Sequence, residues 1–249
     1  RHDSNLSKVG ASGKPRAVRS AVLAVGVNAE GYREVLGLMI GDSESEASWS
    51  EFFTWLKQRG LTGVDLVVSD HHGGLVNAIR RHFQGASWQR CQVHLMRNVL
   101  DAAPAHCQHS LKAKIRLMFN APDMETARRL RDDILSEYGS QAPKAVACLE
   151  AGFEDAMAVM ALPERYRRRL RSTNGLERLN REVRRRERVI GIFPNVASAL
   201  RLLGALLMEQ DEEWTTGRCY LRMDEYWQWK KAKDEASGEK TTSEGDQAA

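Results

Sequence analysis

The chain has 249 residues with a net charge of +4, and 42% of them are hydrophobic and 28% charged, which is typical of a globular protein. No apolar run approaches the roughly 18 residues of a membrane span, and the four cysteines lack the spacing of a small disulfide scaffold. We therefore expect a cytoplasmic protein with reduced thiols and no membrane partner. The mild positive charge permits a polyanionic partner but does not require one.

The N-terminal region predicts a loop followed by a hairpin. Residues 1–18 are rich in Ser, Gly, Lys and Arg without apolar periodicity, which indicates a loop. Two β-rich runs, at residues 20–27 and 34–40, are separated by a turn-forming stretch. Ser43 and Glu46 then have the spacing of a capping box, and apolar residues at helical spacing follow them.

A short buried strand is expected at residues 64–68, ending at Ser69 and Asp70, with a helix after it. Ligand-binding groups gather at the carboxyl ends of strands in open α/β sheets, so Asp70 is a candidate metal ligand. The alternative is that its carboxylate accepts hydrogen bonds from backbone N–H groups at the start of the next helix. Taken alone, this part of the sequence favours the capping role.

The second half of the chain is expected to be helical. A strand around residues 88–93 precedes apolar residues at helical spacing, which predict an all-helical insertion at about residues 95–170. Further helices are expected at about residues 176–188 and 197–214. Residues 233–249 have too few apolar groups to offset the entropy of ordering and are predicted to be disordered.

Glu177 lies on the first of these two helices, three residues after Asn174, a spacing that a capping box could explain. The same helix has arginines on the face that contains Glu177, and Leu176, Leu179 and Val183 form an opposite apolar side. A docked helix would hold these cations in a fixed array that can neutralise phosphates, although a solvated basic surface is the alternative. The candidate DNA-binding residues are Arg178, Arg181, Arg184, Arg185 and Arg188.

Cys91 and His94 have a spacing that could supply two zinc ligands. The conceivable partners are His71, His72, His106, Cys107 and His109. No second pair among them has a regular spacing, so we expect a buried thiol and a hydrogen-bonded histidine and do not predict zinc.

Five segments of the chain resemble motifs of one known family. They lie at residues 26–37, 69–75, 88–94, 172–180 and 191–195. In this order they are similar to the Mutator-type family of insertion-sequence transposases, and the resemblance extends from about Ala21 to Trp229. A single such motif would be weak evidence, but five in the family's order make coincidence improbable.

The resemblance implies an α/β, RNase H-like fold with a mixed sheet, flanking helices and a helical insertion, forming one core over residues 19–232. It also implies an active site in which two aspartates and a glutamate bind two Mg²⁺ or Mn²⁺ ions. Asp70 matches the second aspartate and Glu177 matches the glutamate. Cys91 and His94 match a Cys-x-x-His motif with a supporting role. Other supporting residues implied by the motifs are His72, Asn174 and Asn180.

In this family the first aspartate lies on a central strand that precedes the hairpin. Asp3 is the only acidic residue upstream of the hairpin, and it lies in the stretch that reads as a loop. We therefore assign no catalytic role to Asp3, and we expect this chain to lack the first strand, to be poorly stable and to be inactive alone.

The implied function is metal-dependent DNA cleavage and strand transfer at the ends of an insertion sequence, with transposon ends and target DNA as partners and a homo-oligomer assembled on DNA. Two alternatives are a non-catalytic DNA-binding remnant that keeps the arginine face and a plain RNase H-like nuclease. If the encoding DNA extended upstream through a strand that carries an aspartate, this would favour the transposase over both alternatives.

Overall fold

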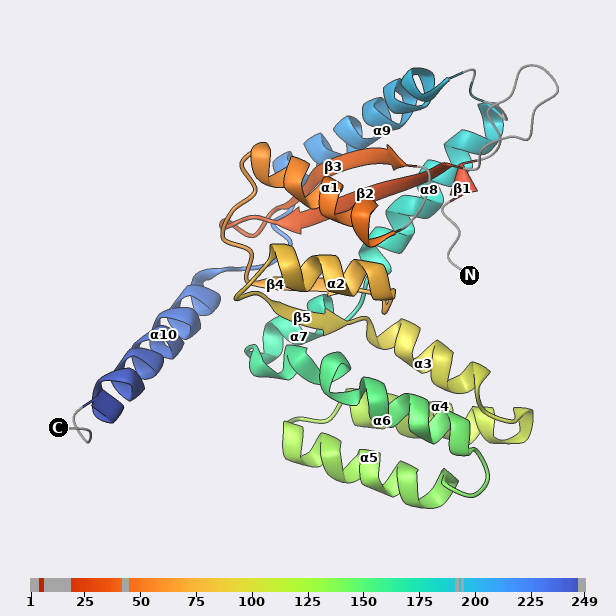
Figure 1. The fold of residues 1–249 in the computed structure, drawn as a ribbon, viewed down its shortest axis with the longest axis vertical. Coiled ribbons are helices and arrows are strands. Elements are labelled where there is room, and N and C mark those ends of the chain that lie inside the picture. Colours follow the sequence, from red (N-terminus) through yellow and green to blue (C-terminus); the bar gives the residue numbers. More distant parts are fainter. Residues whose placement is uncertain (1–4, 7–18, 42–44, 191–192, 194, 246–249) are drawn as a thin grey trace.

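The structure is a computed structural model that describes residues 5–6, 19–41, 45–190, 193 and 195–245. Two small sheets lie beside each other, and a separate group of helices extends from the second sheet (Figure 1). The mixed α/β class predicted from the sequence is confirmed, although most of the described chain is helical. No described helix is both long and apolar enough to span a membrane.

The first sheet has the order β1-β2-β3 and is antiparallel. Its strands are β1 (Asn5–Leu6), β2 (Arg19–Val27) and β3 (Arg33–Gly41). The hairpin was expected, but the sequence indicated a loop throughout residues 1–18, and the structure differs at β1. This strand pairs with β2 on the edge opposite β3, so backbone hydrogen bonding produces a strand where the side-chain pattern shows none.

The hairpin contains a bulge at Leu36, because Ala24 pairs with Gly37 whereas Val25 pairs with Val35. The N–H group of Val35 donates a 2.6 Å hydrogen bond to Oδ1 of Asp211, which lies on α9 (Val196–Thr216). This bond ties α9 to the hairpin.

The second sheet consists of two parallel strands, β4 (Leu66–Ser69) and β5 (Ser87–Arg90). The crossover that parallel pairing requires is provided by α2 (Gly73–His82). β5 ends earlier than the predicted strand at residues 88–93, because α3 (Gln92–Asp101) begins immediately after Cys91. Within the described residues, no strand pairing joins this sheet to the first.

Helices α1 (Glu46–Gln58) and α2 cover the same side of both sheets (Figure 1). Phe52 and Leu56 of α1 are almost fully buried in a cluster with Val22 of β2 and Ile79 of α2. The predicted capping box placed the N-cap of α1 at Ser43, which lies outside the described residues. The N-cap is Ser45, whose hydroxyl accepts a hydrogen bond from the Ser48 backbone N–H at 3.2 Å.

Residues 92–170 form a helical lobe, as their apolar periods predicted. Its elements after α3 are α4 (Ala105–Phe119), α5 (Met124–Tyr138), α6 (Pro143–Met157), the 3-10 helix η1 (Ala158–Ala161) and α7 (Glu164–Leu170). Ile115, Leu149 and Phe153 are fully buried in a hydrophobic core that belongs to this lobe alone.

Helix α8 (Asn174–Ile190) leads from the lobe back to the first sheet, where α9 packs on the face of the hairpin opposite α1. Helix α10 (Asp224–Gly245) projects away from the body (Figure 1). The sequence predicted disorder from Lys233 onward, but α10 continues to Gly245. The Glu, Lys and Ala residues of this segment favour local helix formation, which the absence of apolar periodicity does not reveal.

Gln89 of β5 connects the sheet to the lobe, and we predict that its loss lowers stability. Its buried side chain donates to the Ala156 carbonyl at 2.7 Å and accepts from the Val159 N–H at 2.6 Å. Replacing Gln89 with alanine should lower the free energy of unfolding by about 2–4 kcal/mol, since it leaves a cavity and a buried donor without an acceptor. Chemical denaturation measures this value, with the exposed Gln58→Ala as control. Equal stability of the two variants would contradict the prediction.

Candidate active site

The parallel pairing of β4 and β5 places the residues that follow the two strands at one edge of the sheet. The backbone N–H of Cys91 donates to the Ser69 carbonyl at 2.7 Å, which continues the pairing one residue past β5. Asp70 and Cys91 therefore leave the sheet at the same edge. The Gln92 N–H donates to the Arg171 carbonyl at 3.0 Å, which brings the segment before α8 to this edge as well.

Four side chains from this edge and from the start of α8 form a connected group. The Thr173 backbone N–H and hydroxyl each donate to Sγ of Cys91 at 3.4 Å, and the same hydroxyl lies 3.4 Å from Oε1 of Glu177. Nε2 of His94 lies 3.4 Å from the same Glu177 oxygen. Glu177 is thus oriented by a histidine and a threonine, and Cys91 fixes the threonine.

The protonation of this group reflects its contacts. Hydrogen bonding to Cys91 raises the pKa of His94 against the opposing effect of burial, and the carboxylates of Glu177 and Asp70 raise it further. Burial raises the pKa of the Cys91 thiol, but hydrogen bonds from His94 and Thr173 outweigh it and leave the pKa below its ordinary value. Both candidate carboxylates therefore act on one imidazole.

Asp70 is half-buried and follows β4 directly. The N-cap of α2 is His72, and in the described part of the chain no backbone N–H donates to the Asp70 carboxylate. The capping role that the sequence favoured for Asp70 is therefore wrong, because α2 begins too far along the chain. Its carboxylate is left available for another ligand.

The capping-box interpretation of Asn174 and Glu177 also fails. Helix α8 begins at Asn174, and the Glu177 N–H donates to the carbonyl of Thr173, which precedes the helix. The Glu177 side chain contacts Thr173 and His94, and it makes no hydrogen bond to the helix start other than that to Thr173 in the described residues. Thr173 was not among the site residues predicted from the sequence, although a hydroxyl residue immediately before a helix is a recognisable signal.

The remaining supporting residues lie at the margin of this group. His72 and Asn174 are exposed, and Asn180 is half-buried one turn along α8 from Glu177. The structure shows no hydrogen bond from these three side chains to the Cys91, His94 and Glu177 group among the described residues.

The two carboxylates have the chemistry of a divalent-cation site. Oxygen donors suit Mg²⁺, and neither Asp70 nor Glu177 forms a salt bridge with lysine or arginine within the described ranges. Each is half-buried, so its charge is not fully solvated. In the same ranges no three His, Cys, Asp or Glu side chains are grouped closely enough to hold a metal ion.

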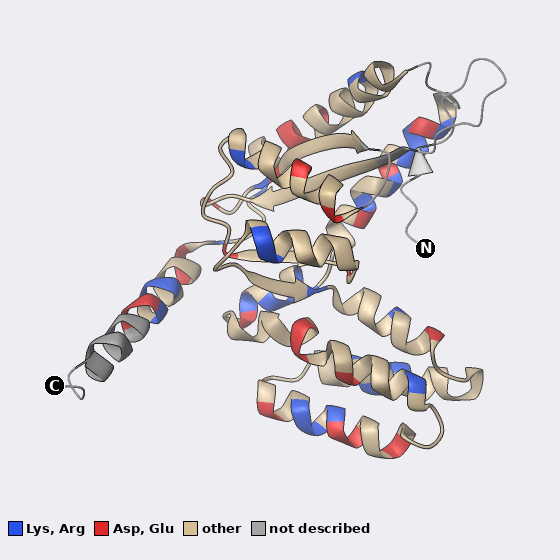
Figure 2. Cartoon of the chain, in the orientation of Figure 1, with Lys and Arg blue, Asp and Glu red and all other residues tan. Residues whose placement is uncertain are grey.

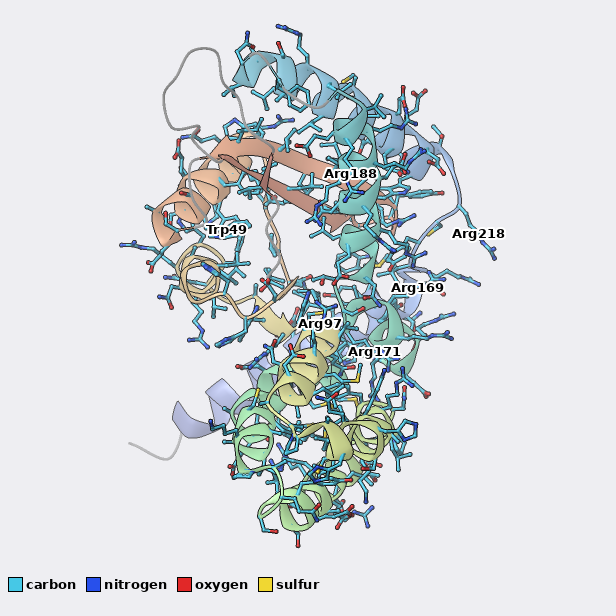
Figure 3. All side chains as sticks on the ribbon, turned by 90° about the vertical axis from the view of Figure 1, so that its right-hand side faces the viewer. Trp49, Arg97, Arg169, Arg171, Arg188 and Arg218 are labelled. Carbon is cyan, nitrogen blue, oxygen red and sulfur yellow. The ribbon has the colours of Figure 1, made fainter. Side chains whose placement is uncertain are left out.

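Of the five candidate DNA-binding arginines of α8, four have exposed side chains and Arg184 is half-buried. Leu179 is buried and Val183 packs beneath the hairpin, whereas the side chains of Arg178, Arg181 and Arg188 are exposed. Basic residues recur along the helix in Figure 2, and Figure 3 looks onto this side of the molecule, with Arg188 labelled on α8. The apolar side of α8 is therefore docked, as the sequence predicted.

One of the candidate arginines is already paired within the helix. Arg185 forms two hydrogen bonds with the Glu182 carboxylate, at 2.7 and 3.0 Å, and Arg186 forms a third at 3.1 Å. Hydrogen bonds from these arginines lower the pKa of Glu182 to about 2. The charge of Arg185 is therefore partly compensated, whereas Arg181 and Arg188 form no salt bridge with the residues that the structure describes.

Comparisons with known proteins agree on one family. The model described as "Transposase, Mutator family" matches residues 2–217. The chain is 44% identical over 209 residues to the transposase for insertion sequence element IS256 in transposon Tn4001 of Staphylococcus aureus, a match that covers 83% of this chain and 53% of that protein. It is 43% identical over 224 residues to the IS406 transposase of Burkholderia multivorans, covering 89% and 57%. It is 41% identical over 222 residues to the IS1081 transposase of Mycobacterium tuberculosis, covering 89% and 53%. The chain thus spans about half the length of these curated relatives.

We predict that the His94 imidazole titrates above the ordinary value of about 6.5 in the metal-free protein, and that Cys91→Ser brings it back toward that value. The stability that comes from protonated His94 is present below about pH 6.5 and is lost as the pH rises through the raised pKa. An NMR titration of the histidine ring signals measures both values, with the exposed His106 as internal control. A His94 pKa that Cys91→Ser leaves unchanged would contradict this account.

Proposed function

Because the chain belongs to the Mutator family of transposases, we propose that it cleaves and joins DNA at the ends of an insertion sequence, using divalent cations held by Asp70 and Glu177. The observation that carries the proposal is the position of two half-buried carboxylates, unpaired with lysine or arginine in the described residues, around His94 and beside the arginines of α8. Transposon ends and target DNA are the proposed partners.

The strand arrangement supports an RNase H-like core. An antiparallel hairpin lies beside a parallel pair, helices α1 and α2 cover a common face, and Asp70 follows the first parallel strand. The helical lobe comes between the strands and α8, which contains Glu177. This is the chain order that the resemblance implied.

Bound cations would activate the attacking oxygen and stabilise the leaving oxygen at a phosphodiester. The residues of the chain orient the ligands: His94 and Thr173 hold one oxygen of Glu177, and Cys91 anchors Thr173. Because its pKa is raised, the His94 imidazole keeps its proton to a higher pH than an ordinary histidine, and in that form it would offset negative charge at the site.

The proposal extends to Asp3 as a third carboxylate. Asp3 lies outside the described residues, but β1 begins two residues after it and pairs with β2 on the edge opposite β3. The resemblance places the first family strand beside the hairpin on this side. The presence of β1 is the reason to revise the sequence analysis, which found no such strand and gave Asp3 no role.

We expect Asp70→Asn and Glu177→Gln each to weaken Mn²⁺ binding at least about tenfold, since each removes one of few charged ligands. Titration followed by electron paramagnetic resonance measures the affinity. The same variants, and Asp3→Asn, should abolish metal-dependent joining of insertion-sequence ends.

Asp101→Asn and Glu150→Gln are matched controls on exposed positions of the helical lobe. Wild-type Mn²⁺ affinity in Asp70→Asn or Glu177→Gln would reject the site. A chain that binds DNA but neither binds Mn²⁺ nor joins DNA would instead support the non-catalytic alternative.

We also expect that replacing Arg181, Arg184 and Arg188 with alanine weakens DNA binding and reduces its salt dependence. Each lost phosphate contact should make the slope of log K against log salt shallower by about 0.9. Fluorescence anisotropy with a labelled duplex, repeated over a range of salt concentrations, measures the slope.

The matched control replaces Arg116, Arg128 and Arg129, three exposed arginines of the helical lobe, with alanine. It changes the net charge equally, so an equal loss of slope would show that the overall charge, and not the α8 face, determines binding.

A further inference from the structure

A second group of arginines is held by aromatic side chains, outside the candidate arginines of α8. The Arg33 guanidinium lies 4.2 Å from the Trp214 ring centre and 4.7 Å from that of Tyr220. The Arg169 guanidinium lies 4.9 Å from the same Tyr220 ring. We call these four residues the arginine stack. They come from β3, α7, α9 and the segment after α9, so only the fold brings them together.

The arginine stack is held rigidly by the backbone. The N–H groups of Tyr220 and Leu221 both donate to the Gly31 carbonyl at 2.9 Å. Gly31 has a φ of +91°, and a Cβ there would lie 1.7 Å from the Leu221 carbonyl oxygen, so only glycine fits this contact. On the other side, the bond from Val35 to Asp211 fixes α9, which carries Trp214.

The arginine stack gathers positive charge that no salt bridge among the described residues neutralises. Burial lowers the pKa of Arg33, and Arg178 and Arg169 lower it further, while Tyr220 and Glu213 act in the opposite direction. Neither Arg33 nor Arg169 forms a salt bridge with any residue that the structure describes. Arg33 and Arg169 are therefore kept close by their contacts with Tyr220 although their charges repel each other.

Stacking leaves the planar edge of a guanidinium available. An arginine that lies over an aromatic ring still has its in-plane N–H donors, which match the geometry of a phosphate. Arg33 lies over the rings of Trp214 and Tyr220 and covers the face of each ring that it contacts, so we assign the arginine stack to phosphate contacts and not to stacking of bases.

The position of the stack extends the α8 face. Arg178 is close enough to Arg33 to affect its pKa, and Figure 3 shows Arg169 on the same side of the molecule as Arg188. From Arg178 to Arg188 the helix rises about 15 Å, which is the length of only about four base pairs. A bound duplex would therefore extend past the end of this face, toward the arginine stack.

We propose that the arginine stack binds the phosphate backbone of the DNA beyond the segment held by α8. This proposal rests on the proposed function, because it assumes that the chain binds DNA. The contact is independent of sequence, since it is made to phosphates by Arg33 and Arg169, and Trp214 and Tyr220 position these two arginines.

The test measures binding of a labelled DNA duplex of arbitrary sequence by anisotropy over a range of salt concentrations. Arg33→Gln and Arg169→Gln should each make the salt slope shallower by about 0.9 and lower the affinity about eightfold at about 0.1 M salt. Arg33→Lys should keep the slope, because it keeps the charge. The matched control is Arg59→Gln. Arg59 is an exposed arginine at the end of α1, and its guanidinium lies 4.6 Å from the ring centre of Trp55. Helix α1 packs on the opposite face of the hairpin from α9.

A wild-type slope in both Arg33→Gln and Arg169→Gln would overturn the proposal, as would an equal loss in Arg59→Gln. Because Arg169 is exposed, Arg169→Gln provides a test even if Arg33→Gln does not fold. The α8 triple variant separates the two proposals: if it loses DNA binding while the stack variants bind as wild type, only the stack is rejected. If the wild-type chain binds no DNA, both proposals fail.

Discussion

The parallel pairing of β4 with β5 is the constraint on which the candidate site depends. Parallel strands end at the same edge, so Asp70 and Cys91 emerge together although 20 residues separate them in the chain. The hydrogen bond from Cys91 to Ser69 extends this register, and the one from Gln92 to Arg171 brings in the segment that precedes α8. The helical lobe can therefore be long without displacing Glu177, because its two ends are fastened at one place.

Helix α8 combines three roles that impose different requirements on its sides. Its buried side, which includes Leu179, packs against the body of the protein. Its first turn contains Glu177, and its outer side carries arginines. The Glu177 carboxylate lies beside these positive charges, and under the proposed function the arginines would hold the polyanionic substrate while cations bind the carboxylates. The pairing of Glu182 with Arg185 and Arg186 shows that the outer side is not uniformly available.

In the arginine stack, positively charged side chains are held together at the surface differently from those of α8. On α8 the arginines are spaced by the helix, so their repulsion is limited by distance. In the stack Arg33 and Arg169 approach each other through Tyr220, and the contacts of Gly31 with the segment after α9 maintain the approach. The turn of the β2–β3 hairpin thus helps to position the positive charges of the arginine stack.

The sequence by itself determined the elements whose signals are local: the hairpin, the helical lobe, α8 and α9, and the identity of Asp70, Glu177, Cys91 and His94 as candidates. It failed where backbone pairing or context decides. β1 has no side-chain pattern and exists through pairing with β2, and the start of α1 shifted from Ser43 to Ser45. Capping explanations of Asp70 and Glu177 were acceptable from spacing alone, and only the positions of α2 and α8 excluded them. The contacts among Cys91, Thr173 and Glu177, and the stack around Arg33, join residues that are distant in the chain. Only the tertiary structure could decide them, because packing and strand register, not local propensity, determine which distant side chains meet.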